Sequence, residues 1–113
     1  MMESTRQQKI ARLIQKEMGL LFQQEFQGIC SGALVTVTKT SITSDLSLAR
    51  IHLSLFATND KENLLENIRK HSKEIRHHLG KRVHNQLRII PELQFLLDDS
   101  LDYIDNIDQL LKS

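Results

Sequence analysis

The feature that most constrains the fold is a helical apolar stripe in the middle of the chain that is interrupted once and then stopped by a proline. Apolar residues recur at helical spacing at positions 64, 65, 68, 75, 79, 83 and 87. The stripe fails at His71 and Ser72, where a core residue would be expected, and Pro91 disfavours helix in the residue before it. We therefore predict two helices, at about 60–71 and 73–88, separated by a bend or break at His71 and Ser72.

Two segments before these helices and one after them alternate apolar and polar residues, as half-buried strands do. In residues 49–55 the odd positions are apolar and the even positions are polar. Turn-forming residues at Ser44 and Asp45 predict a hairpin between the first two strands. The three strands are expected at about 33–40, 48–56 and 92–98.

Helices are also expected at both ends of the chain. Ser4 and Thr5 stand three residues before Gln7 and Gln8, the spacing of a capping box, so a helix should begin there and run over about 5–26. Asn59 or Asp60 is expected to cap the next helix. Ser100 can cap a last short helix of about 100–111, whose apolar residues would pack back on the domain.

The predicted order is therefore α-β-β-α-α-β followed by a short C-terminal helix. Such an order gives an α+β fold of two layers, with helices on one face of a three-stranded sheet. The third strand arrives after a helical crossover, which favours a mixed sheet over a purely antiparallel one. At 113 residues the chain should form a single domain, 1–113, around one hydrophobic core.

The formal net charge of +1 hides a strong polarity along the chain. Between Arg69 and Ile90 there are seven Lys or Arg residues and one acid, whereas six acids and one base follow from Glu92 onward. Positive charge concentrated on one helical element indicates a surface that binds a phosphate-rich polymer. The competing interpretation is that each charge run is only the solvated side of a helix.

Cations of three helices are candidates for contact with nucleic-acid phosphates. Those of the helix pair are Arg69, Lys70, Lys73, Arg76, Lys81, Arg82 and Arg88, and those of the first helix are Lys9, Arg12 and Lys16. Phosphate contacts govern affinity and salt dependence more than base choice. Aromatic stacking is poorly supplied, because the chain has no Trp and its four Phe are better explained as core. We therefore expect recognition of nucleic-acid shape rather than a base code.

Metal-binding and catalytic patterns are weak. His71, Glu74 and His77 recur at spacings of three, but the flanking cations Lys73 and Arg76 would oppose a metal ion, so no metal site is expected. The sequence has no P-loop, no dinucleotide-binding fingerprint and no convincing nucleophile with its base. Neither enzymatic activity nor a cofactor is expected.

Cysteine usage and hydropathy indicate the compartment. The single cysteine, Cys30, rules out an internal disulfide, and its small neighbours indicate a filler of a loop or core rather than a reactive thiol. No apolar run approaches the roughly 18 residues of a membrane span, and the N-terminal residues lack the apolar core of a signal peptide. These features predict a cytoplasmic protein that does not associate with a membrane.

Several motifs together resemble one known family. The C-terminal half contains Leu-Gly-Lys at 79–81, Pro-Glu-Leu at 91–93, Asp-x-Ser at 98–100 and Ile-Asp-x-Leu-Leu at 107–111. The stretches at 14–26 and 36–54 fit the same family pattern. On these residues the chain closely resembles bacterial ribosome-binding factor A over nearly its whole length.

The resemblance implies a type II KH-like fold and a non-catalytic role in late maturation of the small (30S) ribosomal subunit. It also implies contact with 16S ribosomal RNA, promotion of processing of its 5′ end, a part in growth in the cold, and release by ribosome-associated GTPases. Off the ribosome the protein would be a monomer. Ordinary KH domains clamp nucleic acid with a G-x-x-G loop, which this chain lacks. The family's small-residue kink, Ala-x-Gly, corresponds to His71, Ser72 and Lys73 here.

A protein-interaction module is the other interpretation of the same charges. In that case the basic helix and the acidic C-terminal stretch would make self-complementary contacts without RNA. Binding to small subunits that weakens steeply with salt would favour the RNA-binding interpretation.

Overall fold

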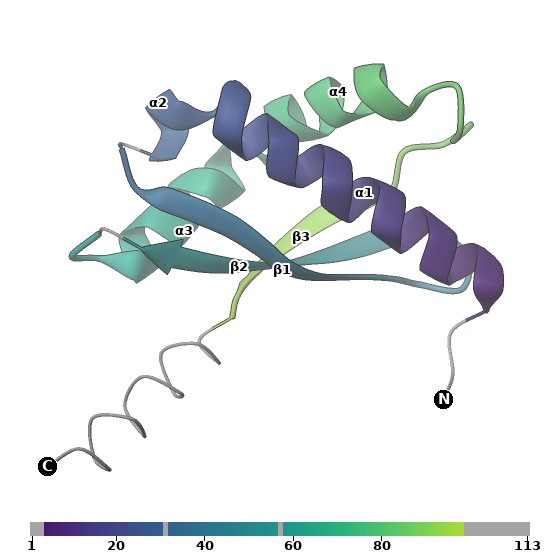
Figure 1. The fold of residues 1–113 in the computed structure, drawn as a ribbon, viewed down its shortest axis with the longest axis horizontal. Helices are drawn as coiled ribbons and strands as arrows, with labels where there is room; N and C mark the ends of the chain where they lie inside the picture. Colours follow the sequence, from purple (N-terminus) through teal and green to yellow (C-terminus); the bar gives the residue numbers. More distant parts are fainter. Residues whose placement is uncertain (1–3, 31, 57, 99–113) are drawn as a thin grey trace, which may run out of the picture.

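The structure, a computed structural model, describes residues 4–30, 32–56 and 58–98. The elements in chain order are α1 (Thr5–Gln24), α2 (Gln27–Cys30), β1 (Leu34–Ile42), β2 (Leu48–Phe56), α3 (Lys61–Lys70), α4 (Ser72–Val83) and β3 (Glu92–Leu97) (Figure 1). The predicted α-β-β-α-α-β order is confirmed, with the four-residue α2 as an addition. The predicted helix of about 100–111 lies outside the described residues. Within the described ranges no helix has both the length and the hydrophobicity needed to cross a membrane.

The sheet is mixed, as predicted. β2 lies in the middle, antiparallel to β1 and parallel to β3. Alternate residues of β2, including Ala49, Ile51 and Leu53, are fully buried beneath the helices, whereas Arg50 on the opposite face is exposed. Figure 1 shows α1 and α4 next to each other above the sheet. The two-layer arrangement expected from the element order is therefore confirmed.

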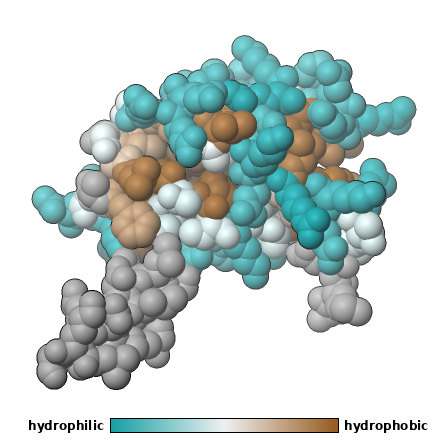
Figure 2. All heavy atoms as spheres, in the orientation of Figure 1, coloured by the Kyte–Doolittle hydropathy of each residue, from teal (hydrophilic) through white to brown (hydrophobic). Residues whose placement is uncertain are grey.

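One hydrophobic core joins the two layers. Ile14 and Leu21 of α1, Ile68 of α3 and Leu79 of α4 all have 0% exposure and belong to a single cluster with the sheet. These are positions of the predicted apolar stripes, so the helical periodicity identified the buried faces. The outer surface is polar, and Figure 2 shows hydrophilic residues over most of the side where α1 and α4 lie.

β1 departs from simple alternation at one point. Val35 and Val37 are buried as predicted, but a register shift between Val37 and Lys39 then moves the buried positions to Thr40 and Ile42. A β-bulge of this kind adds one residue to one strand and so reverses which side chains face the core. The bulge explains why the strand continues to Ile42 when the sequence pattern predicted an end near residue 40.

The helix starts follow local sequence closely. The Ser4 hydroxyl accepts a hydrogen bond from the Gln7 amide at 3.1 Å, and the Gln7 side chain accepts one from the Ser4 amide at 2.9 Å, which completes the predicted capping box. Asp60 caps α3 by accepting from the Asn63 amide at 3.0 Å. The end of α1 was predicted less well, since the helix stops at Gln24 and a short second helix follows where a flexible turn was expected.

The predicted break in the central helical region is confirmed at His71, which separates α3 from α4. The predicted end of α4 near residue 88 is wrong, because α4 stops at Val83. The amides of Gln86 and Leu87 both donate to the Val83 carbonyl at 2.9 Å, closing a turn that sends the chain back toward β3. We call residues 84–91 the return loop. Its path depends on contacts with distant residues that a helical stripe does not reveal.

Candidate nucleic-acid interface

α4 separates its apolar and cationic side chains onto two faces. Ile75, Leu79 and Val83 have 0% exposure and form part of the core. On the outward side, Lys73 and Lys81 are exposed and have no hydrogen-bond or ion-pair partner among the described residues. The buried face fixes the backbone positions of Lys73 and Lys81, while their flexible side chains stay hydrated. Such a side chain can neutralise an RNA phosphate without disturbing the fold.

The return loop lies against this outward face and forms a shallow hollow with it. The hollow is lined by Lys73, Arg76, His77, Gly80, Lys81, His84, Arg88, Ile89 and Ile90, and we call it the α4 hollow. Four of the predicted RNA-binding cations therefore meet in one place. Gly80 permits the close approach, because a Cβ there would lie 3.3 Å from Cγ1 of Ile90.

Arg76 has a structural role within the hollow. Its guanidinium group donates from Nε to the Pro91 carbonyl at 3.0 Å and from Nη2 to the Ile90 carbonyl. These bonds satisfy carbonyl oxygens of the return loop and tie it to α4. Removal of the Arg76 side chain would therefore alter the shape of the hollow as well as its charge.

Two further predicted cations have acceptors within the protein. Arg82 is half-buried between α4 and α1, where it donates to Glu17 at 3.2 Å and to Gln24 at 2.9 Å. Arg69 donates twice to the Phe95 carbonyl, at 3.1 and 3.0 Å, and pairs with Glu66. Both guanidinium groups hold elements together, and their predicted contact with RNA stays a prediction.

The remaining predicted cations lie at several places. Lys9, Arg12 and Lys16 are exposed along α1. Lys16 lines a depression beside β1, whereas Lys70 lines a small pocket that also contains Cys30. None of these four lines the α4 hollow. The charge pattern alone did not separate them from the cations that meet there.

The junction between α3 and α4 lies where an ordinary KH domain has its G-x-x-G loop. His71 alone separates the helices, with φ −98° and ψ 13°, and its Nδ1 lies 2.8 Å from the Asn67 carbonyl. Asn67 also donates from its side chain to the Ile29 carbonyl at 2.8 Å, which ties α3 to α2. Ser72 and Lys73 already belong to α4. A one-residue junction held in this way leaves no projecting G-x-x-G loop, so phosphates would have to be bound by side chains.

The structure adds residues that the charge analysis did not select. His84 and the apolar Ile89 line the α4 hollow, and Ile89 is 76% exposed, an unusual state for isoleucine. His77 also lines the α4 hollow. Across the described ranges, no group of three or more His, Cys, Asp or Glu side chains is placed to hold a metal ion. These histidines are positioned to supplement a polyanion-binding surface.

Comparison with known proteins gives a consistent result. The family model for ribosome-binding factor A matches residues 6–111. The chain is 44% identical to ribosome-binding factor A of Cytophaga hutchinsonii over 110 residues, covering 97% of this chain and 83% of that protein. It is 44% identical to the Flavobacterium johnsoniae protein of the same name over 112 residues, covering 97% and 85%.

Solved structures show the same fold. The crystal structure of ribosome-binding factor A from Thermus thermophilus matches with a TM-score of 0.68 at 19% identity, covering 80% of this chain and 94% of that one. A homology model of the Thermus thermophilus factor, fitted into a cryo-electron-microscopy map of its complex with the 30S subunit, matches with a TM-score of 0.60, also at 19% identity. The match covers 87% of this chain and 97% of that one.

Proposed function

Because this chain belongs to the ribosome-binding factor A family, we propose that it binds the small (30S) ribosomal subunit and assists its late maturation without catalysing a reaction. The Thermus thermophilus factor has been placed in a map of a 30S complex, which supports this partner for a chain of the same family and fold. The finer role proposed here is binding to 16S ribosomal RNA and promotion of processing of its 5′ end. Release by ribosome-associated GTPases, a cytoplasmic location, a part in growth in the cold and a monomeric state off the ribosome belong to the same proposal.

The main support for the proposal is the clustering of cations in the α4 hollow. The hollow brings Lys73, Lys81 and Arg88 together on an outward surface backed by a fully buried helix face. None of these three cations has an acceptor among the described residues, so their charge is available to RNA. Cations on a rigid surface release condensed counterions when they bind phosphates, and their fixed spacing selects the shape of a folded RNA.

The test is equilibrium binding of purified 30S subunits to a triple variant, Lys73→Glu, Lys81→Glu and Arg88→Glu. We expect affinity to fall by about tenfold or more near 100 mM salt, with a shallower dependence of log K on log salt, since each lost phosphate contact lowers the slope by about one. Arg76 and Arg82 are left intact because their reversal would break contacts within the protein.

Lys39→Glu is the matched control, because Lys39 is exposed on β1 beside His52, away from the helices. Its reversal should leave both the affinity and the salt slope nearly unchanged. Equal losses in the triple variant and the control would indicate a general charge effect and would contradict the assignment of the α4 hollow. Unchanged binding in both would contradict RNA binding through the α4 hollow.

A further inference from the structure

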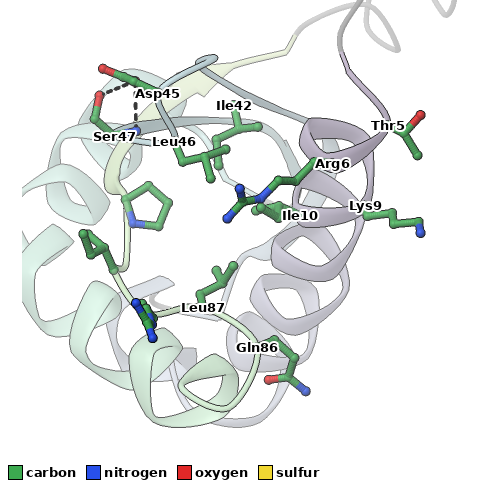
Figure 3. Close-up of a pocket in the computed structure, with 13 residues that line it drawn as sticks. Thr5, Arg6, Lys9, Ile10, Ile42, Asp45, Leu46, Ser47, Gln86 and Leu87 are labelled. Atoms are coloured by element: carbon green, nitrogen blue, oxygen red, sulfur yellow. Dashed lines mark hydrogen bonds between the residues drawn. The ribbon is translucent and has the colours of Figure 1, made fainter.

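A second hollow adjoins the α4 hollow and is lined by more apolar side chains. It lies between the first turns of α1, the turn that joins β1 to β2, and the return loop, and we call it the α1 groove (Figure 3). Its volume is about 950 Å³. The apolar side chains that line it are Ile10, Ile42, Leu46, Leu87, Ile89 and Pro91. Arg88 and Ile89 line both hollows, so the two form one continuous surface.

Leu46 is held in the groove by an unusual backbone conformation. Its φ is +62°, in the left-handed region that favours glycine or asparagine and is costly for a branched side chain. Asp45 stabilises the turn by accepting hydrogen bonds from the Thr43 hydroxyl and from both the amide and the hydroxyl of Ser47. These hydrogen bonds lower the pKa of Asp45, so the carboxylate that accepts them stays ionised to a lower pH than an ordinary aspartate does. The strained turn thus presents an apolar side chain at the groove.

The cations of the groove are unpaired. Figure 3 shows Arg6 projecting from α1 into the groove, whereas Lys9 points away from it. Neither Arg6 nor Arg88 has a hydrogen-bond or ion-pair partner in the part of the chain that the structure describes. The groove therefore combines an aliphatic surface with free guanidinium groups, and it continues directly into the α4 hollow.

We propose that the α1 groove holds an unpaired nucleobase of the RNA whose backbone is bound by the α4 hollow. A nucleobase has apolar faces and polar edges, and it stacks well on the plane of an arginine guanidinium group when aromatic side chains are absent. The groove is large enough for one nucleotide, and Arg88 lies where the phosphate of that nucleotide would pass between the two hollows. This inference rests on the proposed RNA-binding function.

The first test is a methyl NMR titration of the full chain with adenosine or uridine 5′-monophosphate, with ribose 5-phosphate as the arm that lacks a base. We expect saturable shifts at the methyl groups of Leu46, Leu87 and Ile42 with the nucleotides and small shifts with ribose 5-phosphate. The methyl groups of Ile68, in the distant core, should not move. Equal shifts with both ligands would indicate a phosphate site only and would overturn the proposal, as would no shift. Shifts caused only by an acidic leucine-containing peptide would also overturn it, in favour of a protein ligand.

The second test separates this proposal from the proposed function. Leu46→Asn retains a residue that tolerates positive φ but removes the aliphatic side chain, and Arg6→Gln removes the charge. Each should weaken 30S binding by about tenfold, the typical effect of losing one stacked base. Arg50→Gln, on the exposed sheet face, should have no effect.

The outcomes distinguish the two claims. Full affinity in Leu46→Asn and Arg6→Gln, together with weakened binding in the α4 triple variant, would overturn the base site and leave the proposed function standing. Full affinity in every variant would overturn both the base site and the assignment of the α4 hollow, whereas failure of the wild-type chain to bind 30S subunits would overturn the proposed function. Unchanged thermal unfolding of Leu46→Asn would establish that its loss of binding is not a loss of folding.

Discussion

Arg82 and Lys81 are neighbours in sequence and differ completely in surroundings. The Arg82 guanidinium is 27% exposed and bonded to α1, whereas Lys81 is exposed at the α4 hollow. A half-buried guanidinium with two acceptors contributes to folding, because loss of its side chain leaves Glu17 without its cation. A hydrated lysine contributes little to folding and can contribute strongly to a polyanion complex. The roles of Arg82 and Lys81 can therefore be distinguished by experiment.

We predict that Arg82→Ala lowers the free energy of unfolding by about 1 to 2 kcal/mol, through loss of hydrogen bonds to a carboxylate and an amide. Lys81→Ala should change it by less than about 0.5 kcal/mol. Urea unfolding of both variants measures the difference. The opposite order of stabilities would contradict the role assigned to Arg82.

Cys30 gives a prediction about pH. The thiol is buried, and burial raises its pKa from 9.0 to about 11. Below pH 9 the thiol is protonated in both the folded and the unfolded chain, so its pKa shift does not affect stability. Between pH 9 and 11 the unfolded chain loses the proton while the folded chain keeps it, which favours unfolding. Stability should therefore fall by about 1 to 3 kcal/mol more between pH 9 and 11 in the native chain than in Cys30→Ala. Parallel pH profiles for the two proteins would show that the thiol is not shielded.

The sequence identified the cations but not the acceptors to which they donate hydrogen bonds. The acceptors of Arg76 and Arg82 lie 14 to 65 positions away in sequence, so only the folded chain shows that these arginines are occupied. Arg6 was not selected, although it lies three positions before Lys9 and so fits the spacing that joins Lys9, Arg12 and Lys16. Exposed Ile89 had no local pattern that distinguished it from a buried apolar residue.

Among the elements, starts were more predictable than ends. The caps at Ser4 and Asp60 depend on residues three positions away, and the sequence placed each of them within two adjacent candidates. The end of α4 and the bulge in β1 depend on where the chain must go next and on the partner strand. Tertiary contacts decided these features, and a single sequence contains no local record of them.

Gln7 links α1 to β1, and this link can be tested. Its side chain accepts from the Ser4 amide and also donates to the Ile42 carbonyl of β1 at 3.0 Å. Gln7→Ala should therefore remove both half of the capping box and a tie between α1 and the sheet, at a cost of about 1 to 2 kcal/mol. Gln8→Ala, at an exposed neighbour, should cost less than about 0.5 kcal/mol. Thermal unfolding distinguishes the two, and equal melting temperatures would contradict the tie.

For the whole molecule, the arrangement in two layers determines where RNA can bind. The helices use one face of the sheet for the core, and the cations of α4 then face outward on the far side of that layer. The other sheet face carries Arg50 and Lys39, which are exposed but separate from both hollows. A net charge of +1 is therefore compatible with a strongly basic docking surface on one side.

This asymmetry predicts the result of complementation in cells that lack the gene. Deletion should cause free small subunits to accumulate with 16S RNA that is unprocessed at its 5′ end, measured on sucrose gradients and by primer extension. The wild-type chain and Lys39→Glu should restore the profile. The triple variant in Lys73, Lys81 and Arg88 should fail to do so although it folds, because the interface and the core occupy opposite sides of α4. Full rescue by the triple variant would mean that the maturation role does not depend on the α4 hollow. A normal profile in the deletion strain would count against the maturation role itself.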